Sequence, residues 1–133
     1  MIGLIVATHG NLGAELLASA QMIIGPVRNA RDVSINPDQS MEDIRDAITA
    51  AVVEVGADDN GVIIVTDMFG GTPANVSMTF LEPQAVEVLT GVNLPMLLKF
   101  FNSQENLGLD ELAGILKSYG QQSIALASEY LQR

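Results

Sequence analysis

The chain contains a single histidine, His9, within the segment Thr8-His9-Gly10. A neutral imidazole is a nucleophile at physiological pH, and a carboxylate bonded to one ring nitrogen leaves the other nitrogen free to attack. A lone histidine is more often structural than catalytic, so its position decides its interpretation. His9 stands between an apolar run and a helical pattern, where the amides from Gly10 to Gly13 can stabilise an anion. This position favours a histidine that accepts a phosphoryl group.

A second candidate segment, DMFGGTP at residues 67–73, follows another apolar run. Asp67 is either a turn residue that closes a strand or the carboxylate that orients His9. Gly70 and Gly71 either only permit a tight turn or also bring backbone amides to a phosphoryl group, and Thr72 either only caps a helix or also offers its hydroxyl. The predicted site has two catalytic residues, His9 and Asp67, and four phosphoryl-binding residues, Gly10, Gly70, Gly71 and Thr72.

Strands that alternate with helices must position these residues. Apolar runs predict strands over residues 2–7, 31–35, 61–66 and 85–89. Helical spacing and start signals predict helices over residues 12–24, from Ser40 as a cap through 55, from Pro73 with Thr72 as its N-cap, over 95–101 and over 110–119. Residues 121–133 remain open between further helix and a strand such as 123–127.

This alternation predicts one α/β domain over residues 1–133, a doubly wound and mainly parallel sheet with helices on both faces. Ligands of such sheets bind beyond the carboxyl ends of the strands. His9, Asp67 and the loop at residues 91–93 are therefore expected at one edge. Apolar residues at that edge are expected partly as a docking surface and partly as core: Met68, Phe69, Leu94 and Met96.

Composition narrows the classes of partner. The chain has 133 residues and a formal net charge of −10, which argues against nucleic acid and anionic membranes and favours partners with basic patches. It has no cysteine and one histidine, so no metal site and no cofactor are expected. No apolar run approaches the length of a membrane span and the amino terminus lacks a charged n-region, so a cytoplasmic location without membrane insertion is expected.

Three motifs together carry a family resemblance: Thr8-His9-Gly10, the loop TDMFGGTPAN at residues 66–75, and GVNLPML at residues 91–97. In this order and spacing the chain resembles, over nearly its whole length, the mannose-type IIA component of the bacterial phosphoenolpyruvate-dependent sugar phosphotransferase system. Phe69 stands where some members carry tryptophan and Thr72 where some carry serine.

The resemblance implies a phosphotransferase in which His9 accepts phosphate from the small histidine phosphocarrier protein and donates it to a IIB component. Asp67 matches the family's histidine-orienting aspartate, and Thr72 matches the hydroxyl residue near the phosphoryl group. It also implies a homodimer that exchanges an antiparallel carboxyl-terminal edge strand, which would account for the ambiguous tail. Because no IIB sequence follows Arg133, a separate polypeptide is expected as acceptor.

Other functions fit less well or stay open. A response-regulator receiver would be phosphorylated on Asp67, but it needs acidic residues after strand one and a lysine after strand five, whereas Lys99 and Lys117 fall in predicted helices. A phosphoglycerate-mutase-like phosphatase needs an arginine before the histidine and a second histidine. A regulatory module that signals through phosphorylated His9, reporting carbon or nitrogen status, remains open. The sequence does not indicate which sugar is involved.

Overall fold

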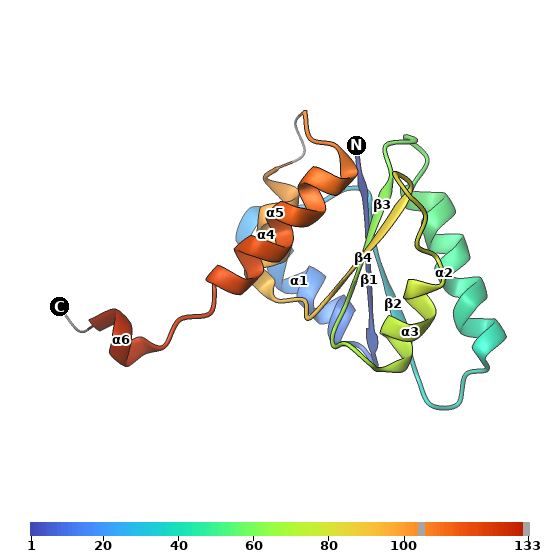
Figure 1. The fold of residues 1–133 in the computed structure, drawn as a ribbon. Helices are drawn as coiled ribbons and strands as arrows, with labels where there is room; N and C mark the ends of the chain where they lie inside the picture. The colour runs from blue at the N-terminus through green and yellow to red at the C-terminus, as the bar shows by residue number, and fades with distance from the viewer. Residues whose placement is uncertain (104–105, 132–133) are drawn as a thin grey trace.

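The computed structural model describes residues 1–103 and 106–131. In these ranges four parallel strands form one sheet in the order β2-β1-β3-β4, and six helices accompany them (Figure 1). The strands are β1 (Gly3–His9), β2 (Ala30–Ile35), β3 (Val62–Thr66) and β4 (Val86–Thr90). The helices are α1 (Leu12–Ile24), α2 (Met41–Val55), α3 (Thr72–Met78), α4 (Leu94–Phe101), α5 (Leu109–Gln122) and α6 (Ala127–Leu131).

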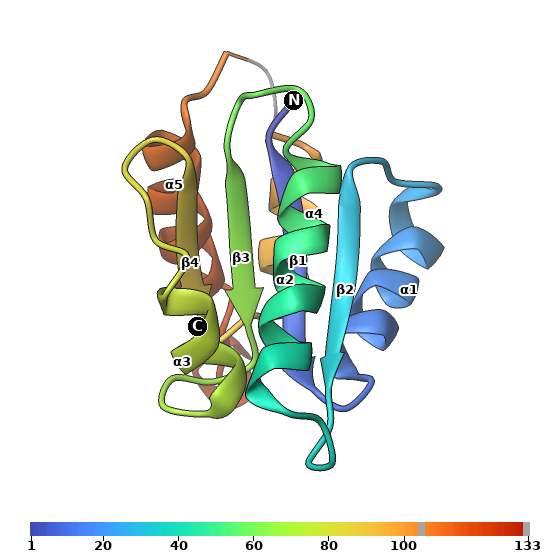
Figure 2. The ribbon, with the colours of Figure 1, turned by 90° about the vertical axis from the view of Figure 1, so that its right-hand side faces the viewer.

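Helices cover both faces of the sheet because the central strands are apolar on both sides. Successive side chains of a strand point to opposite faces, so Leu4 and Val6 enter the core under α1, α4 and α5, and Ile5 and Ala7 enter the core under α2 and α3. Figure 2 shows α2 and α3 in front of the sheet and α1, α4 and α5 behind it. The predicted doubly wound α/β fold is confirmed.

The strand order sets the position of the site. Strand β2 lies on one side of β1 and β3 on the other, and residue Ala7 of β1 pairs with Thr66 of β3. The connections that leave β1 and β3 therefore begin side by side at the same end of the sheet. In doubly wound sheets the crevice at such a switch in strand order is the usual ligand site.

The end of β1 and the start of α3 differ from the predicted positions by one or two residues. Strand β1 continues through His9 itself, and α3 begins at Thr72 with Gly71 as its N-cap, without a side-chain capping bond. The predicted N-cap role of Thr72 was therefore wrong by one residue. Gly71 has an extended backbone, with φ −89° and ψ 170°, and Thr72 is the first residue with helical geometry. The N-cap is therefore Gly71 and not Thr72.

The tail leaves the body of the molecule beyond α5 and ends in the short helix α6 (Figure 1). Residues 123–126 lie between these helices without regular structure, and Ile124 is 79% exposed. A strand over residues 123–127 is not present in the single described chain, whereas an exchanged strand would require a second copy and stays a prediction. Residues 132 and 133 of the tail fall outside the described residues.

Candidate functional site

His9 is the last residue of β1, and the turn after it is fixed by hydrogen bonds from both sides. The amide of Gly10 donates to the carbonyl of Ile35 at the end of β2, at 2.9 Å. The buried hydroxyl of Thr8 accepts a hydrogen bond of 2.8 Å from the amide of Gly13 in the first turn of α1. These bonds hold the backbone on either side of His9, so the imidazole starts from a fixed point while its side chain remains 51% exposed.

Asp67, the first residue after β3, contacts His9 twice. Its Oδ2 lies 2.8 Å from Nδ1 of the imidazole and accepts a hydrogen bond of 3.1 Å from the backbone amide of His9. Its other oxygen, Oδ1, accepts a hydrogen bond of 3.1 Å from the amide of Met68. Both carboxylate oxygens are engaged, and the bond at Nδ1 leaves Nε2 as the ring nitrogen available for chemistry.

The environment of Asp67 favours its ionised form. Burial of the carboxylate raises its pKa, but the hydrogen bonds from the side chain and amide of His9 lower it more, so the pKa of Asp67 lies below its ordinary value of 3.8. The carboxylate is therefore charged at neutral pH. The lowered pKa of Asp67 stabilises the fold at pH values above the ordinary pKa of the carboxyl group. This stabilisation is lost as the pH falls through the lowered pKa.

The loop at residues 70–72 lies against the free side of the imidazole. A Cβ on Gly71 would come within 2.7 Å of Cε1 and 3.2 Å of Nε2 of His9, so only a glycine allows this approach. Gly70 has a φ of 88°, a conformation that favours glycine. Within the described residues the amides of Gly70, Gly71 and Thr72 donate no hydrogen bond. This loop thus offers unpaired donors close to Nε2.

Gly71→Ala is expected to slow any phosphoryl transfer through His9 by about a hundredfold, since misplacing a reacting group by about 1 Å can cost that much. The new methyl group would push the ring away from its position beside Asp67 and cover Nε2. Rates of transfer and a thermal melt measure the two effects. Gly114→Ala is the matched control, because no atom lies within 4 Å of the new Cβ. Equal rates in the two variants would show that close approach to His9 is unimportant.

One further prediction about this edge needs correction, and another is confirmed. The amide of Gly10 was expected to face a phosphate, but it donates to the carbonyl of Ile35 and is not free. The loop at residues 91–93 lies at the same end of the sheet, as predicted, with the amides of Gly91 and Val92 donating to the carbonyl of Thr66. Asn93 caps α4 and donates to the carbonyl of Gly120.

The apolar residues expected at the edge divide between surface and core. Phe69 is 72% exposed and Met68 is also exposed, both in the loop that follows Asp67. Leu94 is half-buried, and Met96 is buried against α5 in the core. Of these four residues, only Met68 and Phe69 present large exposed apolar surfaces.

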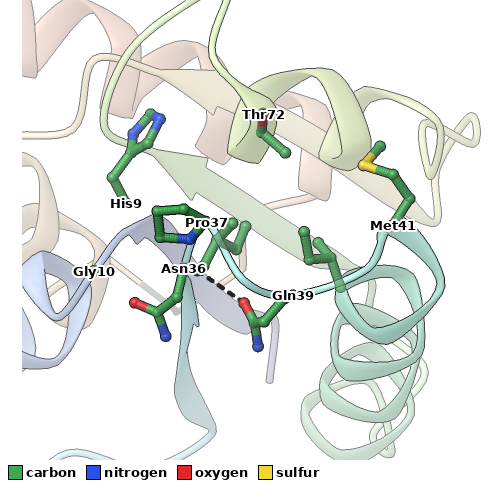
Figure 3. A pocket seen from close by; sticks show the side chains of 9 residues that line it. His9, Gly10, Asn36, Pro37, Gln39, Met41 and Thr72 are labelled. Atoms are coloured by element: carbon green, nitrogen blue, oxygen red, sulfur yellow. Dashed lines mark hydrogen bonds between the residues drawn. The ribbon is translucent and has the colours of Figure 1, made fainter.

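A pocket of about 420 Å³ opens beside His9, between the end of β2 and the start of α2 (Figure 3). His9, Gly10 and Thr72 line one side, and residues from the end of β2, the β2–α2 connection and the start of α2 line the rest. No sequence pattern indicated residues 36–39 of this connection as part of a site. Its position was nevertheless a signal, because it follows a parallel strand and so reaches the same edge as His9.

The described part of the chain offers neither a metal site nor a membrane span. No group of three or more His, Cys, Asp or Glu side chains within residues 1–103 and 106–131 is placed to hold a metal ion. None of the helices in these ranges is both long enough and apolar enough to cross a bilayer.

A family model described as the PTS system fructose IIA component, EIIA-man, matches residues 3–116. The chain belongs to this family. The match extends from the first strand into α5 and includes His9, Asp67 and the loop at residues 70–72. The mannose-type IIA resemblance of the sequence is thereby confirmed, and with it a phosphocarrier role in the sugar phosphotransferase system (PTS).

Relatives in this family differ in their named sugars and in their length. The fructose-specific EIIA component of Bacillus subtilis is 32% identical, over 100% of this chain and 91% of the relative. The mannose-specific EIIAB component of Escherichia coli K12 is 26% identical over 92% of this chain, which corresponds to 38% of that longer relative.

Solved structures of IIA proteins share the fold. The EIIA component of Streptococcus agalactiae superposes with a TM-score of 0.87 at 28% identity, covering 97% of this chain and 99% of that one. The mannose/sorbose-specific IIA subunit of Enterococcus faecalis gives a TM-score of 0.82 at 33% identity, covering 93% and 92%.

Proposed function

We propose that this IIA chain carries a phosphoryl group on Nε2 of His9, taking it from the small histidine phosphocarrier protein and passing it to a separate IIB component in the cytoplasm. The observation that carries the proposal is the 2.8 Å contact between Nδ1 of His9 and Oδ2 of Asp67, which leaves Nε2 free beside an unpaired glycine loop. Membership of the IIA family supports the same role.

In the proposed step the Nδ1 proton of neutral His9 is bonded to Asp67, and the Nε2 lone pair attacks the phosphorus of a phosphohistidine on the donor. A P–N bond to Nε2 forms as the donor's P–N bond breaks, and the donor's nitrogen takes the bonding electron pair. The imidazole of His9 thereby becomes a phosphorylated cation, which the ionised carboxylate of Asp67 stabilises. Transfer to the acceptor reverses these changes.

The loop amides and the hydroxyl of Thr72 are proposed to bind the phosphoryl oxygens. The amides of Gly70, Gly71 and Thr72 have no other partner in the described chain, and Thr72 is exposed at the rim that it shares with His9 (Figure 3). Preorganised donors of this kind stabilise transferred charge without reorganising. No lysine or arginine lines this pocket among the described residues, so the site relies on neutral donors.

The direct test mixes the purified chain with phosphoenolpyruvate, the first enzyme of the system and the histidine phosphocarrier protein. We expect a phosphate that is labile in acid and stable in base, with the ³¹P signal of an Nε2-phosphohistidine. Because this chain has one histidine, such a signal on the chain separated from the donor proteins identifies His9. Adding a IIB component should remove the label. Absence of any label on the wild-type chain would refute the carrier role.

We also propose a homodimer in which the tail of one copy extends the sheet of the other. Support comes from β4, which is an edge strand of the sheet, and from the exposed apolar side chains Ile124 and Leu126 in the segment that precedes α6. Light scattering should give twice the monomer mass for the full chain, and a monomer when the chain is cut after Gln122. A monomeric full chain would exclude the exchange.

A further inference from the structure

We infer that the pocket beside His9 is a socket for one apolar side chain of the protein that exchanges phosphoryl groups with His9, and that its acidic rim selects a partner with basic residues around that side chain. This inference rests on the proposed carrier function, and it adds how the partner is held. The pocket and two exposed acidic residues next to its lining in the sequence are here called the socket: Ile35, Pro37, Met41 and Ile44 as its apolar wall, and Asp38 and Glu42 as its rim.

The lining of the socket is mainly apolar and lies directly beside the reacting group. Ile35 and Ile44 are buried and form its fixed part, whereas Pro37 and Met41 are exposed at its mouth. In Figure 3 Met41 stands across the pocket from His9, with Pro37 between them. A volume of about 420 Å³ lies within the range of about 300–1,000 Å³ for ligand pockets, so an inserted side chain has room.

The connection that forms the wall is fixed by its own hydrogen bonds. The amide of Asn36 donates to Oε1 of Gln39 at 2.8 Å, and the amide of Gln39 donates to the carbonyl of Asn36 at 3.2 Å. Ser40 then caps α2, its hydroxyl accepting from the amide of Asp43 at 3.0 Å. A wall built in advance loses little conformational entropy when a partner binds, which favours its use as a contact site.

The charges around the socket favour a basic partner. Residues 36–46 contain four acidic side chains, Asp38, Glu42, Asp43 and Asp46, and all are exposed. Arg45 is the single base of this segment, and its guanidinium donates to the hydroxyl of Thr79 on α3 at 3.1 Å. A phosphoryl group on His9 adds further negative charge. Complementary positive charge on the partner speeds encounter and fixes its orientation.

A protein side chain suits this position better than an independent small molecule. Because the pocket shares His9 and Thr72 with the site, a protein that brings phosphorus to Nε2 approaches beside its mouth. Contact there would anchor the partner at one side of the reacting atoms. Desolvated apolar anchors of this kind often carry much of the binding energy of an interface.

The test uses Met41→Gln, which keeps the length of the side chain but makes it polar, and the double variant with Asp38→Lys and Glu42→Lys. Each is phosphorylated by the histidine phosphocarrier protein and, separately, by phosphoramidate, a small donor that needs no docking. Asp110→Lys, an exposed residue at the start of α5, is the charge control. For both socket variants we expect KM for the protein donor to rise about tenfold, the loss typical of one interface anchor. Labelling by phosphoramidate should proceed at the wild-type rate.

Added salt should reduce the difference in KM between the wild type and the Asp38→Lys, Glu42→Lys variant, because salt screens exposed charges. It should not reduce the difference in KM between the wild type and Met41→Gln. If the wild-type chain takes no label from the protein donor, the carrier function itself fails, and the socket falls with it. If the wild type is labelled but both variants match Asp110→Lys, the socket alone is wrong. An equal loss with both donors, or a change in dimer mass instead of KM, would likewise overturn it.

Discussion

His9→Ala is expected to take no acid-labile phosphate from the histidine phosphocarrier protein, a loss of transfer below detection. The chain has no other histidine that could form a phosphoramidate bond. The fold should survive, because the side chain is 51% exposed and its polar contact is with Asp67 alone among the described residues. Autoradiography after acid and base treatment measures the label, and circular dichroism with a thermal melt measures the fold.

The same experiment separates His9 from its nearest rival. An acyl phosphate on Asp67 would be labile in base and would persist in the alanine variant. Both oxygens of Asp67 already accept hydrogen bonds, from His9 and from Met68, which leaves this carboxylate poorly placed as an acceptor of phosphate. A label of wild-type strength on His9→Ala would therefore contradict the central proposal and favour Asp67 as the phosphorylated residue.

Asp67→Asn is expected to slow phosphoryl transfer by about 10²–10⁴-fold, the range seen when an orienting carboxylate or a proton-transfer partner of a reactive histidine is lost. The aspartate serves His9 with one oxygen and the amide of Met68 with the other. Asparagine has one acceptor oxygen and cannot serve both. If its NH₂ group turns to Nδ1, the imidazole proton moves to Nε2, which is then unable to attack.

The lost charge adds to this effect. The pKa of Asp67 lies below its ordinary value, so the wild-type carboxylate is ionised at neutral pH and faces the positive ring formed on phosphorylation. Asparagine supplies no such charge. Rapid-quench measurement of label transfer gives the rate, and Asp110→Asn on the exposed start of α5 is the matched control. If Asp67→Asn transferred phosphate at the rate of the control, Asp67 would have no part in the mechanism.

Within the candidate site, the sequence predicted the loop glycines but not the hydrogen bond of the Gly10 amide or the pocket beside His9. The loop glycines were predicted from their position after a strand, and the structure places Gly71 against His9. The use of the Gly10 amide by Ile35 depends on the pairing of β1 with β2, which a local pattern does not contain. The socket was not predicted for a similar reason, since the pairing of β1 with β2 is what brings the β2–α2 connection beside His9.

The sequence by itself determined the alternation of strands and helices, the apolar character of both faces of the central strands, and the single histidine available for phosphoryl chemistry. Period and composition are local properties, so they can be read along the chain. Only the tertiary structure decided that β3 pairs with β1 opposite β2. That pairing brings Asp67 to within 2.8 Å of His9, which lies 58 positions earlier in the chain. Contacts of this range arise from the packing of whole elements, and this packing places an orienting carboxylate on the histidine at the end of β1.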